Sequence, residues 1–225
     1  MPREGYQEDL DALRDDVLYM SEVVTDRLRM GLEALAHKDD ELAWKVIDGD
    51  DEINQMYLDL EQDCIDLLAL QQPVAGDLRC IAASFKIITD LERIADLATN
   101  LGDYTLAAEQ DIYQDVDVQA IGELVVEMVQ GAMDAYERED PEACVSIAER
   151  DEEVDTACET ASEAVVRDLI EREVDGGSSE KIEQLMGDVS RLLLTVRDLE
   201  RVGDHAVNIA ARTMYMVEND DTLIY

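Results

Sequence analysis

Apolar residues recur along almost the whole chain at alternating spacings of three and four residues. The first run, between about Asp9 and Ala36, is clear, with apolar positions at Leu10, Leu13, Val17, Met20, Val24, Leu28, Leu32 and Leu35. This spacing is typical of an amphipathic α-helix, because 3.6 residues make one turn. The same pattern restarts five times, so we expect six helices, at about 9–36, 41–70, 81–101, 121–136, 141–173 and 179–217.

The breaks between these runs carry residues that cap or stop helices. Asp39 or Asp40 can accept hydrogen bonds from the first turn of the second helix. The dipeptide Asp140-Pro141 places a capping residue before the helical position that best tolerates proline. The segment 174–179, Val-Asp-Gly-Gly-Ser-Ser, is the plainest loop in the chain. Runs and breaks together predict an all-α fold.

An eleven-residue stretch occurs twice, 108 residues apart. The copies read Asp-Leu-Glu-Arg-Ile-Ala-Asp-Leu-Ala-Thr-Asn at 90–100 and Asp-Leu-Glu-Arg-Val-Gly-Asp-His-Ala-Val-Asn at 198–208. A second pair of similar segments, at 50–54 and 151–155, is 101 residues apart, and the loop after the fifth helix can absorb the difference. The repeat predicts two tandem three-helix bundles, because three helices are the minimum that closes such a core. We place the bundles at residues 1–110 and 111–225.

The net charge of the 225-residue chain is −38, from 56 acidic and 18 basic residues. Such a charge can serve to bind cations or a basic partner. Because the acidic residues are spread over every segment and lysine is scarce, a solvated surface suited to very high salt, as in a halophilic cytoplasm, explains them better. A direct nucleic-acid partner is excluded, because phosphate binding needs a basic surface.

The remaining composition predicts a cytoplasmic protein. The N-terminus has no apolar leader, and no uncharged run is long enough to span a bilayer, so we expect no membrane insertion. Four cysteines show no metal-binding or redox spacing and lie in apolar helical contexts, so buried free thiols are expected and a disulfide is the less favoured alternative: Cys64, Cys80, Cys144 and Cys158.

The repeated stretch also spaces oxygen-bearing side chains four residues apart along one helix. Carboxylates at the margin of an apolar face are costly unless they are paired or bound to a metal. Hard oxygen ligands from two facing helices suit Mg, Mn or oxidised Fe better than Zn. We therefore predict two cation sites, the first made by Asp50, Asn54, Glu92, Asp96 and Asn100, and the second by Asp151, Asp155, Glu200, Asp204 and Asn208.

Simpler explanations of these residues stay open. Glu92 can pair with Arg93, and the remaining charge can be solvated. A di-iron enzyme of the ferritin type would need two Glu-x-x-His motifs, and neither His37 nor His205 follows a glutamate at that spacing. No catalytic triad order or phosphate-binding glycine loop is present. His205 falls on the apolar side of its helix and is expected in the core, as is Trp44.

Three segments together resemble the PhoU family of phosphate-uptake regulators over nearly the whole chain. They are the repeated Asp-Leu-Glu-Arg-[Ile/Val]-[Ala/Gly]-Asp, the run Gln-Pro-Val-Ala-Gly-Asp-Leu-Arg at 72–79, and Gly-Asp-Asp-Glu-Ile-Asn at 49–54. The resemblance implies two tandem three-helix bundles, often dimeric, with Glu/Asp-x-x-x-Asp motifs that can hold multinuclear metal. The sequence departs from this pattern at Asn54, where the second half has Asp155, and at 170–177, which replaces the Gln-Pro run.

The resemblance also implies a cytoplasmic role without catalysis. Such a protein restrains phosphate uptake through the phosphate ABC transporter and, in bacteria, a membrane sensor kinase. Two alternatives from other classes remain at this stage, a metal-dependent hydrolase and a purely structural helical scaffold. Assays with several divalent metals would separate the first from the regulator, and tolerance of alanine in the acidic motifs would favour the second.

Overall fold

The computed structural model describes residues 2–70, 74–108, 116–173 and 179–224. Within these ranges the protein is built from helices and contains no strand. There are seven helices in the described ranges: α1 (Pro2–His37), α2 (Asp40–Asp48), α3 (Asp50–Leu70), α4 (Ala75–Ala107), α5 (Val118–Arg138), α6 (Pro141–Glu173) and α7 (Ser179–Glu218). The predicted all-α fold with an internal repeat is confirmed, since α1, α3 and α4 pack on one another as α5, α6 and α7 do.

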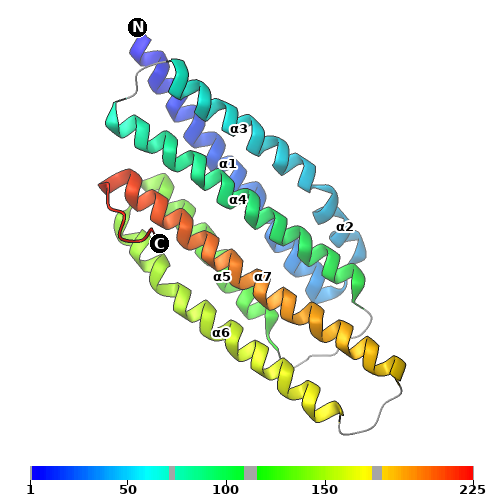
Figure 1. Cartoon of the computed structure of the whole chain (residues 1–225). Helices are drawn as coiled ribbons and strands as arrows, with labels where there is room; N and C mark the ends of the chain where they lie inside the picture. Colours follow the sequence, from blue (N-terminus) through cyan, green and yellow to red (C-terminus); the bar gives the residue numbers. More distant parts are fainter. Residues whose placement is uncertain (1, 71–73, 109–115, 174–178, 225) are drawn as a thin grey trace.

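The helices form two layers in an elongated molecule (Figure 1). The front layer holds α3, α4, α7 and α6 in that order, and α1 and α5 lie behind it. Helices α4 and α7 lie side by side at the centre and run in opposite directions. The two repeated stretches are therefore neighbours in space.

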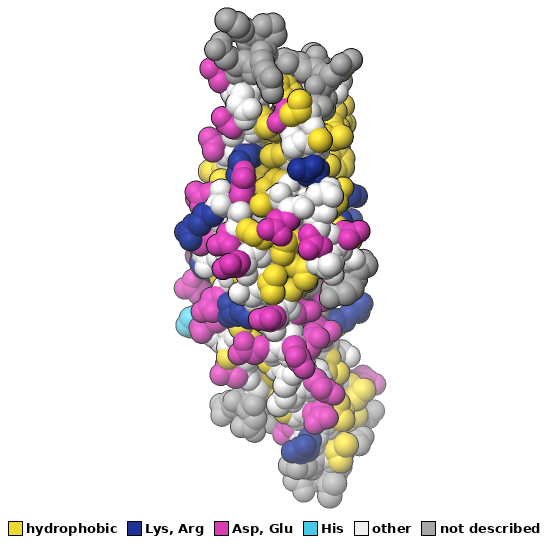
Figure 2. Space-filling view, turned by 90° about the vertical axis from the view of Figure 1, so that its left-hand side faces the viewer, with side chains coloured by type: hydrophobic (Ala, Val, Ile, Leu, Met, Phe, Trp, Pro, Cys, Tyr) yellow, Lys and Arg dark blue, Asp and Glu magenta, His cyan; other side chains and the backbone are white. Residues whose placement is uncertain are grey.

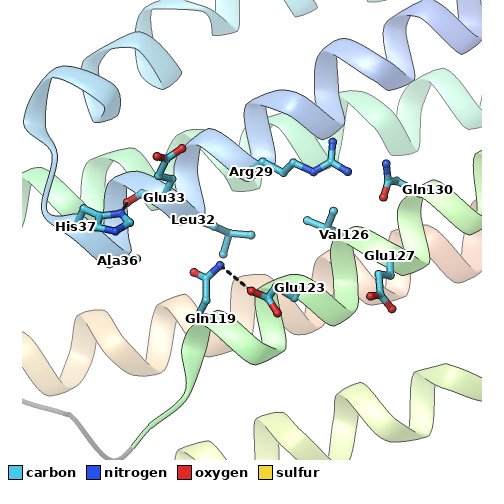
Figure 3. Close-up of a pocket in the computed structure, with 10 residues that line it drawn as sticks. All are labelled: Arg29, Leu32, Glu33, Ala36, His37, Gln119, Glu123, Val126, Glu127 and Gln130. Carbon is cyan, nitrogen blue, oxygen red and sulfur yellow. Dashed lines mark hydrogen bonds between the residues drawn. The ribbon is translucent and has the colours of Figure 1, made fainter.

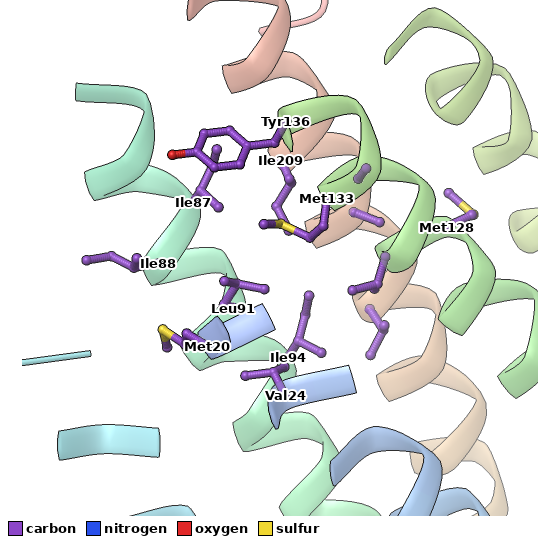
Figure 4. Packing of buried hydrophobic residues seen from close by; sticks show 14 of the residues in the cluster. Met20, Val24, Ile87, Ile88, Leu91, Ile94, Met128, Met133, Tyr136 and Ile209 are labelled. Atoms are coloured by element: carbon purple, nitrogen blue, oxygen red, sulfur yellow. The ribbon is translucent and has the colours of Figure 1, made fainter. Parts of the chain in front are cut away.

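Both halves contribute to one continuous hydrophobic core (Figure 4). Met20 of α1, Leu91 of α4, Met128 of α5 and Ile209 of α7 are all fully buried. The hydroxyl group of Tyr136 lies 2.7 Å from that of Ser84, which satisfies both polar groups in this apolar interior. The two bundles therefore pack as one body.

The predicted second helix is divided in the structure, which corrects the count from six to seven. Helix α2 ends at Asp48 with Gly49 as its C-terminal cap, and α3 begins at Asp50. Arg27 of α1 reaches into this break and donates a hydrogen bond to the carbonyl of Lys45 at 2.6 Å. A β-carbon at Gly49 would come within 1.8 Å of that guanidinium group, so any other residue would require Arg27 to move. The equivalent residue in the second half is Arg150, and α6 continues through it.

Several local predictions can be compared with the structure. Asp39 caps α2 through the amide of Leu42 at 3.0 Å, and Asp140 caps α6 through two amides. All four cysteines are buried free thiols, as expected. Trp44 is not in the core; its side chain is 54% exposed on α2. A nine-residue helix at the end of a bundle has two sides open to solvent, and hydrophobicity alone did not reveal this.

Some predictions fall on residues outside the described ranges. They include the domain boundary between residues 110 and 111, and most of the loop predicted at 174–179. The search for membrane spans found no helix in the described part that is both long and apolar enough to cross a bilayer.

We predict that the fold depends on high salt. The charge of −38 is carried by a single elongated molecule, so self-repulsion at low ionic strength opposes folding. The Debye length, the distance over which charges act on one another before salt screens them, is about 3 Å in 1 M salt and about 30 Å in 0.01 M salt. Circular dichroism on dilution from molar KCl should show a falling melting temperature. An unchanged melting temperature in low salt would contradict the prediction.

Candidate metal centres and the seam between the repeats

The first acidic cluster lies between α3 and α4 in the front layer. Asp50 is in the first turn of α3, where the positive end of the helix dipole favours a carboxylate. Its side chain accepts a hydrogen bond from Asn54 at 2.7 Å and one from Thr99 of α4 at 3.4 Å. Burial, and then the charge of Asp96, raises the pKa of Glu92, to which Asp50 also contributes. The structure therefore brings together four of the five residues predicted for this site.

Part of the charge in the first cluster is balanced by Arg93. Its guanidinium group lies 3.1 Å from Asp96 and 3.5 Å from Glu92. The Arg93 side chain is 55% exposed, so this pairing takes place at the surface and contributes little stability. Glu92 is thus paired with an arginine, as the simpler explanation predicted. This pairing does not remove the repulsion between the carboxylates of the cluster.

The second cluster lies between α6 and α7 and has no such arginine. Asp151 and Asp155 come from α6, and Glu200 and Asp204 from α7. Burial, and then the charge of Asp155, raises the pKa of both α7 carboxyl groups. Across the described ranges, no lysine, arginine or histidine forms an ion pair with any of the four. Four of the five residues predicted for the second site are therefore gathered as well.

Asp151 carries the largest electrostatic cost in either cluster. Burial raises its pKa to about 6, and the charges of Asp155, Asp204 and Glu200 contribute further. Its Oδ1 atom is buried and has no hydrogen-bond partner. A buried carboxylate oxygen without a donor is unfavourable unless a cation or a proton reaches it. This oxygen is the clearest local sign of a missing positive group.

Asn100 and Asn208 do not join their own clusters. Asn100 of α4 donates to Asp198 of α7 at 3.0 Å, and Asn208 of α7 donates to Asp90 of α4 at 3.3 Å. The last residue of each repeated stretch thus binds the first residue of the other copy. Because α4 and α7 are antiparallel, these two hydrogen bonds are related by a local twofold axis. We call this pair of contacts the seam.

Two further side chains complete the seam, and the sequence analysis missed them as partners. His205 Nδ1 lies 2.8 Å from Asp90, and the Tyr104 hydroxyl donates to Asp198 at 2.8 Å. Burial and the bond to Asp198 raise the pKa of Tyr104 to about 12. His205 was expected in the core; its side chain is indeed only 16% exposed, but it is held by a carboxylate. Asp90 and Asp198 are the first residues of the two copies of the repeated stretch. This shared position was the signal in the sequence that could have identified them as functional partners.

The donor sets of both clusters suit a hard cation. Mg, Mn or oxidised Fe could be held by the carboxylates of Asp151, Asp155, Glu200 and Asp204. The Oδ1 atom of Asp151, which accepts no hydrogen bond, can serve as one of the ligands. The first cluster offers three carboxylates and the amide of Asn54. No group of three or more His, Cys, Asp or Glu side chains in the described part of the chain is already arranged as a metal cage. Cation binding would therefore require side chains to turn inward.

A separate cleft of 740 Å³ opens between α1 and α5 in the other layer (Figure 3). Its two basic groups are already engaged, since Arg29 pairs with Asp26 at 3.2 Å and His37 Nδ1 lies 3.1 Å from the carbonyl of Glu33. Gln119 donates to Glu123 within the cleft. These polar groups satisfy one another and do not converge on a common point, so the acidic clusters remain the better candidates.

We predict that Asp151→Asn stabilises the protein when chelator is present. A raised carboxyl pKa means that the folded state binds the proton more tightly than the unfolded state, so stability is lost as the pH rises from about 4 to 6. Above this window the ionised group is unfavourable, and the substitution should raise the melting temperature by about 2–4 °C per kcal/mol relieved. The gain should vanish near pH 4. Glu152→Gln on the exposed side of α6 is the control, and an equal gain there would refute the assignment.

Comparison with known proteins agrees with this architecture. The PhoU domain model matches residues 17–105 and 118–213. A phosphate-specific transport system accessory protein PhoU homolog of Pseudomonas aeruginosa is 33% identical over 219 residues, covering 96% of this chain and 86% of that protein. The accessory protein PhoU of Escherichia coli is 28% identical over 218 residues, with the same coverage of 96% and 86%.

Solved structures give the same result. The crystal structure of PhoU from Pseudomonas aeruginosa superposes with a TM-score of 0.85 at 33% identity, covering 96% of this chain and 100% of that one. The phosphate transport system regulatory protein PhoU from Streptococcus pneumoniae gives 0.84 at 26% identity, covering 96% and 98%. Because the family model and the relatives span both halves, the chain belongs to the PhoU family.

Proposed function

We propose that this protein is a cytoplasmic negative regulator of phosphate uptake that acts on a phosphate ABC transporter without catalysing a reaction. The observation that carries the proposal is the match of both repeats to relatives named as accessory proteins of phosphate-specific transport. The described helices offer contact surfaces and acidic clusters, and the cleft between α1 and α5 lacks converging reactive groups. The sensor kinase and the homodimer implied by the family resemblance stay predictions.

We further propose that the two clusters bind divalent or trivalent cations as part of this regulatory role. Asp151, Asp155, Glu200 and Asp204 would hold one ion, and Asp50, Asn54, Glu92 and Asp96 the other. A bound ion would supply positive charge where the carboxylates repel one another. Four carboxylates without an ion-paired arginine favour tighter binding at the second cluster, whereas Arg93 competes for the first.

A metal-dependent hydrolase is supported less well. Such an enzyme would need a cation with an open position and a general base beside it. His205 is the histidine nearest in sequence to a cluster, and its Nδ1 already contacts Asp90 across the seam. The regulator therefore accounts for more of the observed contacts than the enzyme does.

Deletion of the gene should raise phosphate uptake in phosphate-replete cells. A negative regulator restrains the transporter under these conditions, so its loss leaves uptake unrestrained. Uptake of labelled phosphate, measured in a strain that has no second copy of the gene, gives the result. Restoration by the wild-type gene is the control, and normal uptake in the deletion strain would falsify the regulatory role.

Metal content should depend on the second cluster more than on the first. Protein purified without chelator and titrated with Mn²⁺ should lose its tighter site in the double variant Glu200→Gln/Asp204→Asn. The variant Glu149→Gln/Glu152→Gln removes the same formal charge from the exposed part of α6 and should retain that site. Equal metal content in the wild type and in the first variant would show that the acidic motifs are only solvated charge.

A further inference from the structure

Large apolar side chains are exposed at both ends of the front layer. At the end where α3 leads to α4, Ile65 is 45% and Leu78 is 46% exposed. At the opposite end, where α6 leads to α7, Val166 is 45% and Met186 is 51% exposed. Figure 2 shows the molecule from the side of the front layer, with hydrophobic side chains toward both ends and acidic side chains spread along the length.

These positions are equivalent in the two repeats. Val166 follows Ile65 by 101 residues, and Met186 follows Leu78 by 108, which are the offsets of the acidic motifs. A third pair, Val74 at 51% and Ile182 at 39% exposure, obeys the same rule. Exposed apolar side chains are unfavourable in water, and here they occur at equivalent positions of both halves on a strongly acidic surface. A shared use explains that better than chance exposure does.

The apolar positions lie on the same side of their helices as the acidic clusters. Ile65 is eleven residues, about three turns, from Asn54, and Leu78 is eighteen residues, about five turns, from Asp96. Val166 and Met186 stand at these same spacings from Asp155 and Asp204. Each repeat therefore presents one strip along its hairpin, apolar at the tip and acidic near the middle of the molecule. Eighteen helical residues give each strip a length of about 27 Å.

We propose that each strip binds an amphipathic helix of a partner protein, with apolar residues at one end and lysine or arginine at the other. A helix of about eighteen residues matches the length of a strip, and apolar anchors at helical spacing fit the exposed tip. Basic residues would lie over the acidic end, where charge complementarity fixes the direction of binding. The local twofold of the seam relates the strips, so one chain takes two such helices.

A second copy of this chain fits the strips less well. Its net charge is also −38, so pairing two front layers would set acidic clusters against acidic clusters. The basic helix carries the opposite charge and meets no such repulsion. This inference rests on the proposed function in one respect, that the helix belongs to the partner that the protein regulates. Binding of a helix to the strips can be measured without that assumption.

Direct binding can be tested with a designed probe. The probe is a labelled eighteen-residue helical peptide with leucine at i, i+3, i+4 and i+7 in one half and lysine on the same side in the other half. The control peptide has the same composition with the leucine stripe broken. Fluorescence anisotropy, with chelator and enough KCl to keep the protein folded, should give two probe sites per chain and none for the control peptide.

Substitutions at the tips should remove these sites one at a time. Leu78→Asp should leave one site, and Leu78→Asp/Met186→Asp none, because losing a central apolar anchor weakens binding by about tenfold or more. Tyr19→Asp, at an exposed apolar side chain of α1 in the other layer, should keep both sites. The pair Ile65→Asp/Val166→Asp repeats the test at other residues, and circular dichroism confirms folding of each variant.

The outcomes separate this inference from the proposed function. In the deletion strain, the wild type and Tyr19→Asp should restrain phosphate uptake, whereas Leu78→Asp/Met186→Asp should not. Full restraint by a folded tip variant would overturn the inference and leave the regulatory function standing. A deletion without effect would count against the regulatory function alone, and the probe would still decide the strips. A dimer that the tip variants dissolve, without probe binding, would assign the strips to a second copy and overturn the inference.

Discussion

The architecture depends on two largely buried carboxylates that meet their partners only across the centre of the molecule. Asp198 is 5% exposed, and it accepts hydrogen bonds from Asn100 and Tyr104 of the other repeat. Asp90 is held in turn by His205 and Asn208. A carboxylate removed from water is costly without donors, and neither repeat supplies them to its own aspartate. Separating the halves would break all four of these contacts and expose the core across α4 and α7 to water.

This constraint divides the repeated stretch into two sets of side chains with different contacts. Its first and last residues face the other repeat, whereas the glutamate and second aspartate face the middle helix of their own bundle. The clusters on either side of the seam remain within electrostatic reach of it. Burial and neighbouring carboxylates raise the pKa of Glu92 and Asp204, and His205 acts in the opposite direction on both. A histidine bonded to Asp90 thus stands between two groups of acids, and a change in charge at either cluster is felt at the contact that joins the halves.

The sequence was sufficient for those features that depend on periodicity and repetition. Helical spacing gave the all-α fold, and the two offsets gave the internal repeat and eight of the ten clustered side chains. It was not sufficient for Asn100 and Asn208, because their spacing from Asp96 and Asp204 fits a ladder along one helix equally well. Only the antiparallel contact of α4 with α7 decides the direction in which they point. The break at Gly49 was missed for a similar reason, since it depends on Arg27 from another helix.

Charge and exposed apolar area have opposite responses to salt, and this determines how the front layer can be used. In molar salt, charges act on one another over only about 3 Å. Long-range attraction of a basic partner would therefore be weak under the conditions in which we predict the protein to fold. Burial of apolar side chains is not screened in this way, and some salts strengthen it. Exposed residues such as Ile65 and Met186 would then supply most of the affinity, while the nearby carboxylates fix orientation at contact distance. A strongly acidic protein that works in high salt therefore has a physical reason to keep apolar side chains beside its charged clusters.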